Sequence, residues 1–249
     1  MFGAADAYDR FMGRYSTQLA PQFADVAGVE EGQQVLDVGC GTGTLTAECL
    51  RRRATVAAVE PSEPFVAAVA ERYPDVDVRC GVAEHLPFPD NEFDAALAQL
   101  VVHFMREPVN ALREMRRVTR SGGVVAACVW DHAGEQAPVS AFWHAVREVD
   151  PEAEDESQLA GARQGHLTEL LNEAGLAEVE EGALQIRVEH SSFDEWWEPF
   201  TLGVGPAGAY FATLDPESQR HVRDACRSAF SPGKLHIQAQ AWVARGRST

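Results

Sequence analysis

Apolar residues in the first half of the chain form short unbroken runs, separated by segments in which apolar side chains recur at helical spacing. An unbroken run predicts a strand buried on both faces, and helical spacing predicts an amphipathic helix. The predicted strands are residues 35–39, 55–60, 76–80, 93–99 and 124–130, and the predicted helices are 44–52, 64–72 and 107–119, with a turn over 120–123. This alternation indicates an α/β fold with a parallel sheet covered by helices on both faces.

The second half of the chain breaks this rhythm. Residues 131–165 are polar and acidic, and residues 191–233 are rich in aromatic side chains. We expect these two segments to form a cap over the carboxyl edge of the sheet, where open α/β sheets bind ligands. The remaining predicted elements are helices within 1–34, a helix near 139–149, a helix over 166–174 that ends at Gly175, and strands over 176–189 and 235–245.

The first predicted strand leads into three closely spaced glycines, Gly39, Gly41 and Gly43, and a helix begins at once with Thr44. Glycine is needed where the backbone turns sharply or approaches a ligand without a Cβ atom between them. The second strand ends at an acid, Glu60, at the same edge of the sheet. A carboxylate there accepts hydrogen bonds from the two hydroxyls of a ribose. The pattern therefore predicts a ligand that contains adenosine.

The glycine spacing discriminates between two classes of nucleotide ligand. Dinucleotide folds place their third glycine three residues after the second, but Thr44 stands at that position here. Asp37 also lies two residues before Gly39. The three glycines together with Asp37 fit a ligand that lacks a pyrophosphate and carries an amino-acid group. A nicotinamide-dependent oxidoreductase remains the less favoured alternative.

Taken together, these motifs resemble those of class I S-adenosylmethionine-dependent methyltransferases, of the small-molecule type similar to ubiquinone/menaquinone methyltransferases. The resemblance covers roughly residues 8–130 and is carried by residues 35–43, 59–62, 83–94, 99–103 and 114–123. It implies a single methyltransferase domain over 1–249, with a helical lid over 1–34 and a cofactor-binding half over 35–130. It also implies a Rossmann-like, seven-stranded, mostly parallel sheet whose last strand is antiparallel.

The resemblance further implies S-adenosylmethionine as the cofactor and S-adenosylhomocysteine as its product. The residues that would bind the cofactor are Tyr8, Arg14, Asp37, Gly39, Cys40, Gly41, Gly43, Glu60, Pro61, Ala83, Glu84, Gln99 and Leu100. In this scheme Ala83 and Glu84 contact the adenine, and Arg14 pairs with the cofactor's carboxylate. From the residues alone, Asp37 serves equally well to cap backbone amides of the turn, and Tyr8 and Arg14 serve equally well as surface residues of a helix.

Methyl transfer requires alignment, exclusion of water and an acceptor in the right protonation state. His103 follows the fourth strand and is the candidate general base, because imidazole titrates near neutral pH. A purely local hydrogen bond is the competing role, and Asp131 and His132 are weaker candidates. The side chains expected to contact the acceptor are His103, Trp130, Trp196, Trp197, Phe200 and Tyr210, although the aromatic residues would also serve to pack the cap.

Composition narrows the partners. The net charge of −17 argues against nucleic acid and anionic membranes, which attract basic surfaces. Five scattered cysteines without metal-ligand spacing, no secretory signal and no long apolar run favour a cytoplasmic protein. Residues 99–106 hold no carboxylate, so we expect no metal. The acceptor is then a small, partly apolar molecule, methylated on oxygen, nitrogen or carbon. A protein that binds the cofactor without turnover, as a regulator, remains an alternative.

Overall fold

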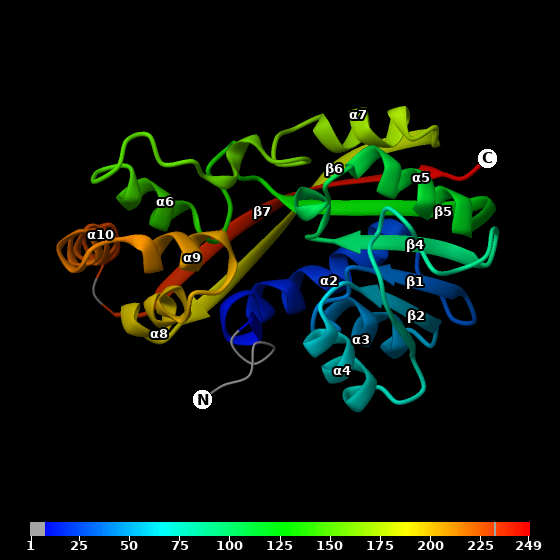
Figure 1. Ribbon diagram of the computed structural model, residues 1–249, viewed down its shortest axis with the longest axis horizontal. Coiled ribbons are helices and arrows are strands. Elements are labelled where there is room, and N and C mark those ends of the chain that lie inside the picture. The colour runs from blue at the N-terminus through cyan, green and yellow to red at the C-terminus, as the bar shows by residue number, and fades with distance from the viewer. Residues whose placement is uncertain (1–7, 232) are drawn as a thin grey trace.

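The computed structural model describes residues 8–231 and 233–249, and within them the strands form one seven-stranded sheet in the order β3-β2-β1-β4-β5-β7-β6 (Figure 1). The strands are β1 (Gln34–Val38), β2 (Thr55–Glu60), β3 (Asp77–Cys80), β4 (Phe93–Gln99), β5 (Thr119–Trp130), β6 (Ala177–His190) and β7 (Leu235–Arg247). The pairs among β1 to β5 are parallel, and β7 is antiparallel to both β5 and β6. The predicted mostly parallel sheet with an antiparallel last strand is confirmed.

The central strands carry apolar side chains on both faces, and helices cover the sheet on both sides and bury them. One face packs against α2 (Arg14–Ala27), α3 (Thr44–Arg51) and α4 (Glu63–Arg72), and the other against α5 (Pro108–Val118) and α7 (His166–Glu173). The apolar side chains of each helix face inward, as with Phe23 of α2 and Met115 of α5, which are fully buried. These helices fix the strand ends on which the site is built.

The turn expected over residues 120–123 is wrong. Strand β5 already begins at Thr119 and runs through this segment. The C-terminal residues explain the difference, because Ser248 exchanges backbone hydrogen bonds with Gly122 and Gly123. This pairing across more than a hundred residues carries no local sequence signal. Gly175 adopts a left-handed conformation directly after α7, as expected for a glycine that ends a helix.

The two expected cap segments lie together at one end of the sheet, beyond the carboxyl ends of β4 and β5 (Figure 1). Their α-helices are α6 (Ser140–Val146), α8 (Phe193–Trp197), α9 (Gly205–Thr213) and α10 (Pro216–Ser228), and they also contain the short helical turns η3 (Glu156–Gln158) and η4 (Glu198–Leu202). Two further short helical turns, η1 (Asp9–Gly13) and η2 (Val102–Phe104), lie outside the cap. The long strands β6 and β7 carry the second segment outward. None of the helices in the described ranges combines the length and hydrophobicity needed to cross a bilayer.

Candidate active site

The three glycines after β1 form a turn that other residues fit poorly. Gly39, Gly41 and Gly43 have φ angles of 69°, 54° and 87°, in the left-handed region that favours glycine. A Cβ atom on Gly39 would lie 2.4 Å from Cγ2 of Val101, and one on Gly43 would lie 2.9 Å from the ring of Tyr73. Backbone shape therefore favours glycine at all three positions, and lack of space adds to this at Gly39 and Gly43.

Glu60 lies at the base of this turn and ties it to the end of β2. Its Oε2 accepts a hydrogen bond from the N–H of Gly41 at 3.0 Å, and its Oε1 accepts one from the N–H of Ser62 at 3.0 Å. Burial is the main cause that raises the pKa of this carboxyl above its usual value. Each carboxylate oxygen has a second lone pair, so Glu60 is still able to accept from a ligand.

A groove of about 560 Å³ begins at this turn and follows the edge of the sheet. Four of the predicted cofactor residues line it: Gly39, Pro61, Ala83 and Glu84. The carboxylate of Glu84 accepts hydrogen bonds from the N–H groups of Arg106 and Glu107, so in this structure it caps the start of α5.

Asp37 is also engaged by its own neighbourhood. Its Oδ2 accepts a hydrogen bond from the hydroxyl of Thr46 at 2.7 Å, which joins the glycine turn to α3. Burial is the main cause that raises the pKa of Asp37 to about 7. In this structure Asp37 thus links the end of β1 to the first turn of α3, on either side of the glycine turn.

The end of β4 has an unusual backbone. Leu100 has a φ of +59°, and its N–H donates to the carbonyl of Cys128 at 2.9 Å. A non-glycine residue in this region stores strain, which structures retain mainly at functional sites. The neighbouring Gln99 donates through Nε2 to the carbonyl of Ser16, whereas its buried Oε1 has no hydrogen-bond partner among the described residues.

The lid residues Tyr8 and Arg14 have different surroundings. A Cβ atom on Gly41 would lie 3.9 Å from the ring of Tyr8, so this ring covers the glycine turn. Burial, followed by the charge of Glu60, raises the pKa of Tyr8 to about 12. Nη1 of Arg14 lies 2.9 Å from both Oε1 of Glu195 and Nδ1 of His190. The guanidinium expected to bind the cofactor's carboxylate is thus already paired with the cap.

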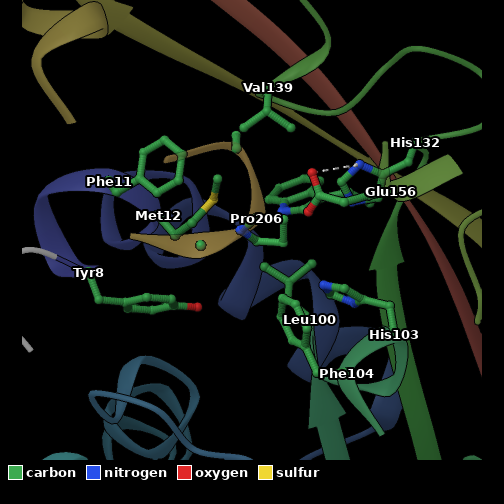
Figure 2. Close-up of a pocket in the computed structure, with 13 residues that line it drawn as sticks. Tyr8, Phe11, Met12, Leu100, His103, Phe104, His132, Val139, Glu156 and Pro206 are labelled. Atoms are coloured by element: carbon green, nitrogen blue, oxygen red, sulfur yellow. Dashed lines mark ion pairs between the residues drawn. The ribbon is translucent and has the colours of Figure 1, made fainter. Parts of the chain in front are cut away.

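A second, smaller cavity of about 40 Å³ adjoins the groove at Phe104 (Figure 2). Tyr8 and Met12 line it from the lid, and Pro206 lines it from the cap. Figure 2 shows His103, His132 and Glu156 grouped opposite Tyr8 and Phe11. Phe104 lines both this cavity and the groove, so the two spaces are neighbours across a single side chain.

Three ionisable groups opposite Tyr8 also have strongly shifted pKa values. Burial, followed by the charge of His132, lowers the pKa of His103 to about 3, and burial lowers that of His132 to about 4. Burial raises the pKa of Glu156 to about 7. Oε2 of Glu156 accepts a hydrogen bond from Nε1 of Trp143 at 2.8 Å and lies 4.0 Å from Nδ1 of His132. Both imidazoles are therefore neutral at pH 7.

Three buried polar atoms of the cavity residues lack a hydrogen-bond partner within the described chain. They are Nδ1 of His103, Nε1 of Trp130 and Nε2 of His132. A buried polar atom without a partner is destabilising and needs an explanation, such as a ligand. Their concentration on one cavity marks it as the place where a second molecule would bind.

Comparison with known proteins identifies the fold family. A family model described as a methyltransferase domain matches residues 36–127. Residues 36–127 therefore belong to a methyltransferase domain, and the sheet has the architecture expected for the class I, S-adenosylmethionine-dependent type. A demethylmenaquinone methyltransferase of Renibacterium salmoninarum is 38% identical over 108 residues, which are 43% of this chain and 46% of that protein. The chain spans about half the length of the first curated relatives that it matches.

Solved structures extend the likeness of the methyltransferase domain to the cap. The YcgJ protein of Bacillus subtilis aligns with 94% of this chain and 99% of its own, with a TM-score of 0.57 and 20% identity. A SAM-dependent methyltransferase of Aquifex aeolicus aligns with 73% of this chain and 91% of its own, with a TM-score of 0.55 and 19% identity. At this identity the likeness shows the fold alone.

The structure brings only part of the predicted acceptor site to the cavity of the methyltransferase domain. His103 and Trp130 line it, but Trp196, Trp197, Phe200 and Tyr210 do not. Trp196 and Phe200 are buried against each other, with ring centroids 5.0 Å apart. The hydroxyl of Tyr210 donates to Asp150 at 2.6 Å. These four residues pack the cap, the alternative that the sequence left open, because aromatic rings from α6, α8 and α9 fill its interior.

The sequence did not predict Glu156 as a site residue, and it indicated His132 only as a weaker candidate. Glu156 belongs to an acidic run that reads as a solvent-exposed segment, but it is buried beside His132. His132 directly follows β5 at the carboxyl edge, and this position was its only signal. The adjacent Asp131 accepts hydrogen bonds from Gly134, Gln136 and Gln240 and so organises the loop instead. His85 is exposed, away from the residues that line this cavity.

Proposed function

We propose that this protein binds S-adenosylmethionine in the groove and transfers its methyl group to a small molecule in the cavity. The observation that carries the proposal is the junction of the two spaces at Phe104, which lines both. On one side lies a glycine turn with a buried carboxylate at its base. On the other lies a mainly apolar cavity whose residues carry polar atoms without partners in the described chain. A cofactor in the groove would thus end where an acceptor begins.

The groove fits the parts of this cofactor. The methionine moiety would lie against the backbone at Gly39, and Glu60 would accept hydrogen bonds from the ribose hydroxyls. Ala83 lines the stretch where the adenine would lie. The unpartnered Oε1 of Gln99 would receive a hydrogen bond from the ammonium group. When bound, the cofactor supplies a methyl group already activated by a positively charged sulfur.

The chain's own residues supply alignment and exclusion of water. Tyr8 lies between the glycine turn and the cavity, so its ring would border the sulfur. Phe11 and Met12 cover the cavity from the lid. The free volume of about 40 Å³ admits only a few atoms, so we infer that the lid shifts when an acceptor enters. Dry, fixed surroundings favour displacement of the methyl group over hydrolysis.

The acceptor is proposed to be mainly apolar, with one polar edge. The apolar lining from Leu100, Val139 and Ala207 would contact its body. Its polar edge would face the N–H of Trp130 and the free nitrogens of His103 and His132. His103 is poorly suited to act alone as a general base, because an imidazole whose pKa is about 3 holds a proton weakly at neutral pH.

Calorimetric titration of the protein with S-adenosylmethionine, S-adenosylhomocysteine and NAD tests the first half of this proposal. We expect the first two to bind with a stoichiometry of one and NAD not to bind. Tight binding of NAD alone would overturn the proposal. Incubation with methyl-labelled cofactor and a fractionated metabolite extract tests the second half. Label in a low-molecular-weight product supports transfer, whereas binding without any transfer favours a regulatory protein.

A further inference from the structure

The side chains of His103, His132 and Glu156 come together although they lie on three separate segments. His103 belongs to η2 after β4, His132 follows β5, and Glu156 belongs to η3 in the first cap segment. Each offers one ligand atom, and these atoms all lie within 4.8 Å of one another. All three residues are buried, with exposed fractions of 8%, 8% and 7%.

Resting on the proposed function, we propose that these three residues bind a divalent first-row transition-metal ion, which in turn binds the methyl acceptor. Two imidazoles and one carboxylate form the ligand set of catalytic zinc sites and of non-haem iron sites, with positions left for substrate. This contradicts the expectation from the sequence that no metal is bound. That expectation considered residues 99–106 and did not foresee a carboxylate from position 156.

The unpartnered atoms support a ligand at this place. Nδ1 of His103 and Nε2 of His132 are both buried without a hydrogen-bond partner in the described chain. A ring nitrogen without a hydrogen-bond partner is the atom with which imidazole coordinates a metal ion. A metal ion would also supply a positive charge beside the buried carboxylate of Glu156.

The surroundings of the three residues resemble the outer shell of a metal site. Nε1 of Trp143 donates to Oε2 of Glu156 at 2.8 Å, which fixes the orientation of the carboxylate. The ring of Phe104 lies against that of His103, with centroids 4.0 Å apart. Ligand atoms around a zinc ion stand about 3–4 Å apart. Binding would therefore draw the present set inward by a small movement of side chains.

The metal site narrows the chemical class of the acceptor. An ion with three protein ligands keeps positions for a bidentate molecule, so we expect an acceptor whose hydroxyl stands beside a carbonyl or a second hydroxyl. Coordination lowers the pKa of that hydroxyl, and its proton leaves to solvent. The oxygen then forms a bond to the methyl carbon while the carbon–sulfur bond breaks. The products are a methyl ether and S-adenosylhomocysteine.

The test measures metal binding directly and does not depend on an acceptor. Tag-free full-length protein, freed of metal with a chelator, is titrated with Zn²⁺ in competition with a chromophoric chelator, and with Co²⁺ while the visible absorption is recorded. We expect one equivalent of each to bind, and a Co²⁺ spectrum typical of nitrogen and oxygen ligands. Mg²⁺ at millimolar concentration should not compete, because imidazole is a poor ligand for it.

Substitutions assign the ion to this site. His103→Ala, His132→Ala and Glu156→Gln should each weaken Zn²⁺ binding at least 100-fold, and Trp143→Phe should weaken it about tenfold through the carboxylate. His144→Ala is the matched control, since His144 is exposed on the same helix as Trp143, and it should leave binding unchanged. Circular dichroism and the affinity for S-adenosylmethionine verify that each variant is folded.

Wild-type protein that binds neither Zn²⁺ nor Co²⁺ would overturn the metal site. So would equal losses in His144→Ala and His103→Ala. If a variant does not fold, X-ray absorption of the wild-type Co²⁺ form decides, because two imidazole ligands are expected and their absence would contradict the proposal. S-adenosylmethionine binding without metal binding rejects this inference alone. Metal binding without S-adenosylmethionine binding rejects the proposed function alone.

Discussion

The cofactor half and the cap build their parts of the site by different means. In the cofactor half, residues 35–130, the site is largely backbone: a glycine turn, strand ends and one carboxylate that accepts from main-chain N–H groups. Where the cap, residues 131–165 and 191–233, meets the lid and the ends of β4 and β5, the site consists of side chains from separate segments. A site built from backbone can be predicted from a short sequence motif, whereas a site built from side chains depends on how several segments pack.

The two halves are also stabilised differently. Around the glycine turn, space and φ angles allow few residues other than glycine, so the addition of a single Cβ atom is expected to disturb the backbone. The cap is filled by rings in mutual contact, including the stacked pair Phe142 and Phe200 with centroids 4.7 Å apart. Such a cluster tolerates exchanges of similar volume but not loss of a ring. Four substitutions test this difference.

The largest effect is expected from truncation in the cap. Trp196→Ala removes a buried ring that contacts Phe230 and Phe200, and should lower the free energy of unfolding by about 3–5 kcal/mol in urea denaturation. Trp196→Phe, which retains a ring, should cost less than half as much. If Trp196→Ala left stability unchanged, the packing role assigned to this residue would be wrong.

The second-largest effect is expected when a single methyl group is added in the cofactor half. Gly39→Ala places a Cβ 2.4 Å from Val101 and should weaken S-adenosylmethionine binding at least ~100-fold, or about 2.7 kcal/mol. Gly28→Ala is the control, because Gly28 has the same backbone conformation, with a φ of 70°, and nothing within 4 Å of the added atom. Gly28→Ala should lower the free energy of unfolding by about 1 kcal/mol through backbone strain and should leave the affinity for S-adenosylmethionine unchanged. Equal affinities for the two variants would contradict the close-approach argument.

The pH dependence of stability reports on Asp37. Its pKa is raised from 3.8 to about 7 on folding, so the folded state holds a proton that the unfolded state has lost. Its contribution is therefore complete below pH 3.8 and is lost as the pH rises to about 7. Between pH 5 and pH 8 we expect a decrease of up to roughly 2.7 kcal/mol in the unfolding free energy.

Asp37→Asn should remove this part of the pH dependence, as measured by urea unfolding at the two pH values. Asp75→Asn, at an exposed position in the same half, should retain it. Identical pH profiles for the wild type and Asp37→Asn would show that this carboxyl does not titrate in that range.

The smallest effect is expected at Glu60. Glu60→Gln keeps the shape of the side chain but replaces a charged acceptor by a neutral one, and should weaken S-adenosylmethionine binding roughly tenfold, which calorimetry resolves. Glu63→Gln, on an exposed acid three residues along, should have no effect. An unchanged affinity in Glu60→Gln would remove the ribose role.

Much of the fold followed from local pattern. The boundaries of β2 and β4 agree with the prediction, since both are unbroken apolar runs flanked by polar residues. The start of β5 did not follow, because its first residues pair with the C-terminal strand region. Arg14 likewise has partners on β6 and the cap that lie more than 170 residues away. Sequence periodicity contains no record of such distant pairings.

By itself, the sequence determined the strand–helix alternation, the glycine turn and the carboxylate that closes β2. It did so because those features depend on neighbouring residues and on parallel strands ending at a common edge. Only the tertiary structure decided that Trp196 packs inside the cap, that Glu156 lies beside His103 and His132, and that their polar atoms face one cavity. Those placements depend on the direction of each side chain after the cap has packed, which burial and sterics fix for the whole chain at once.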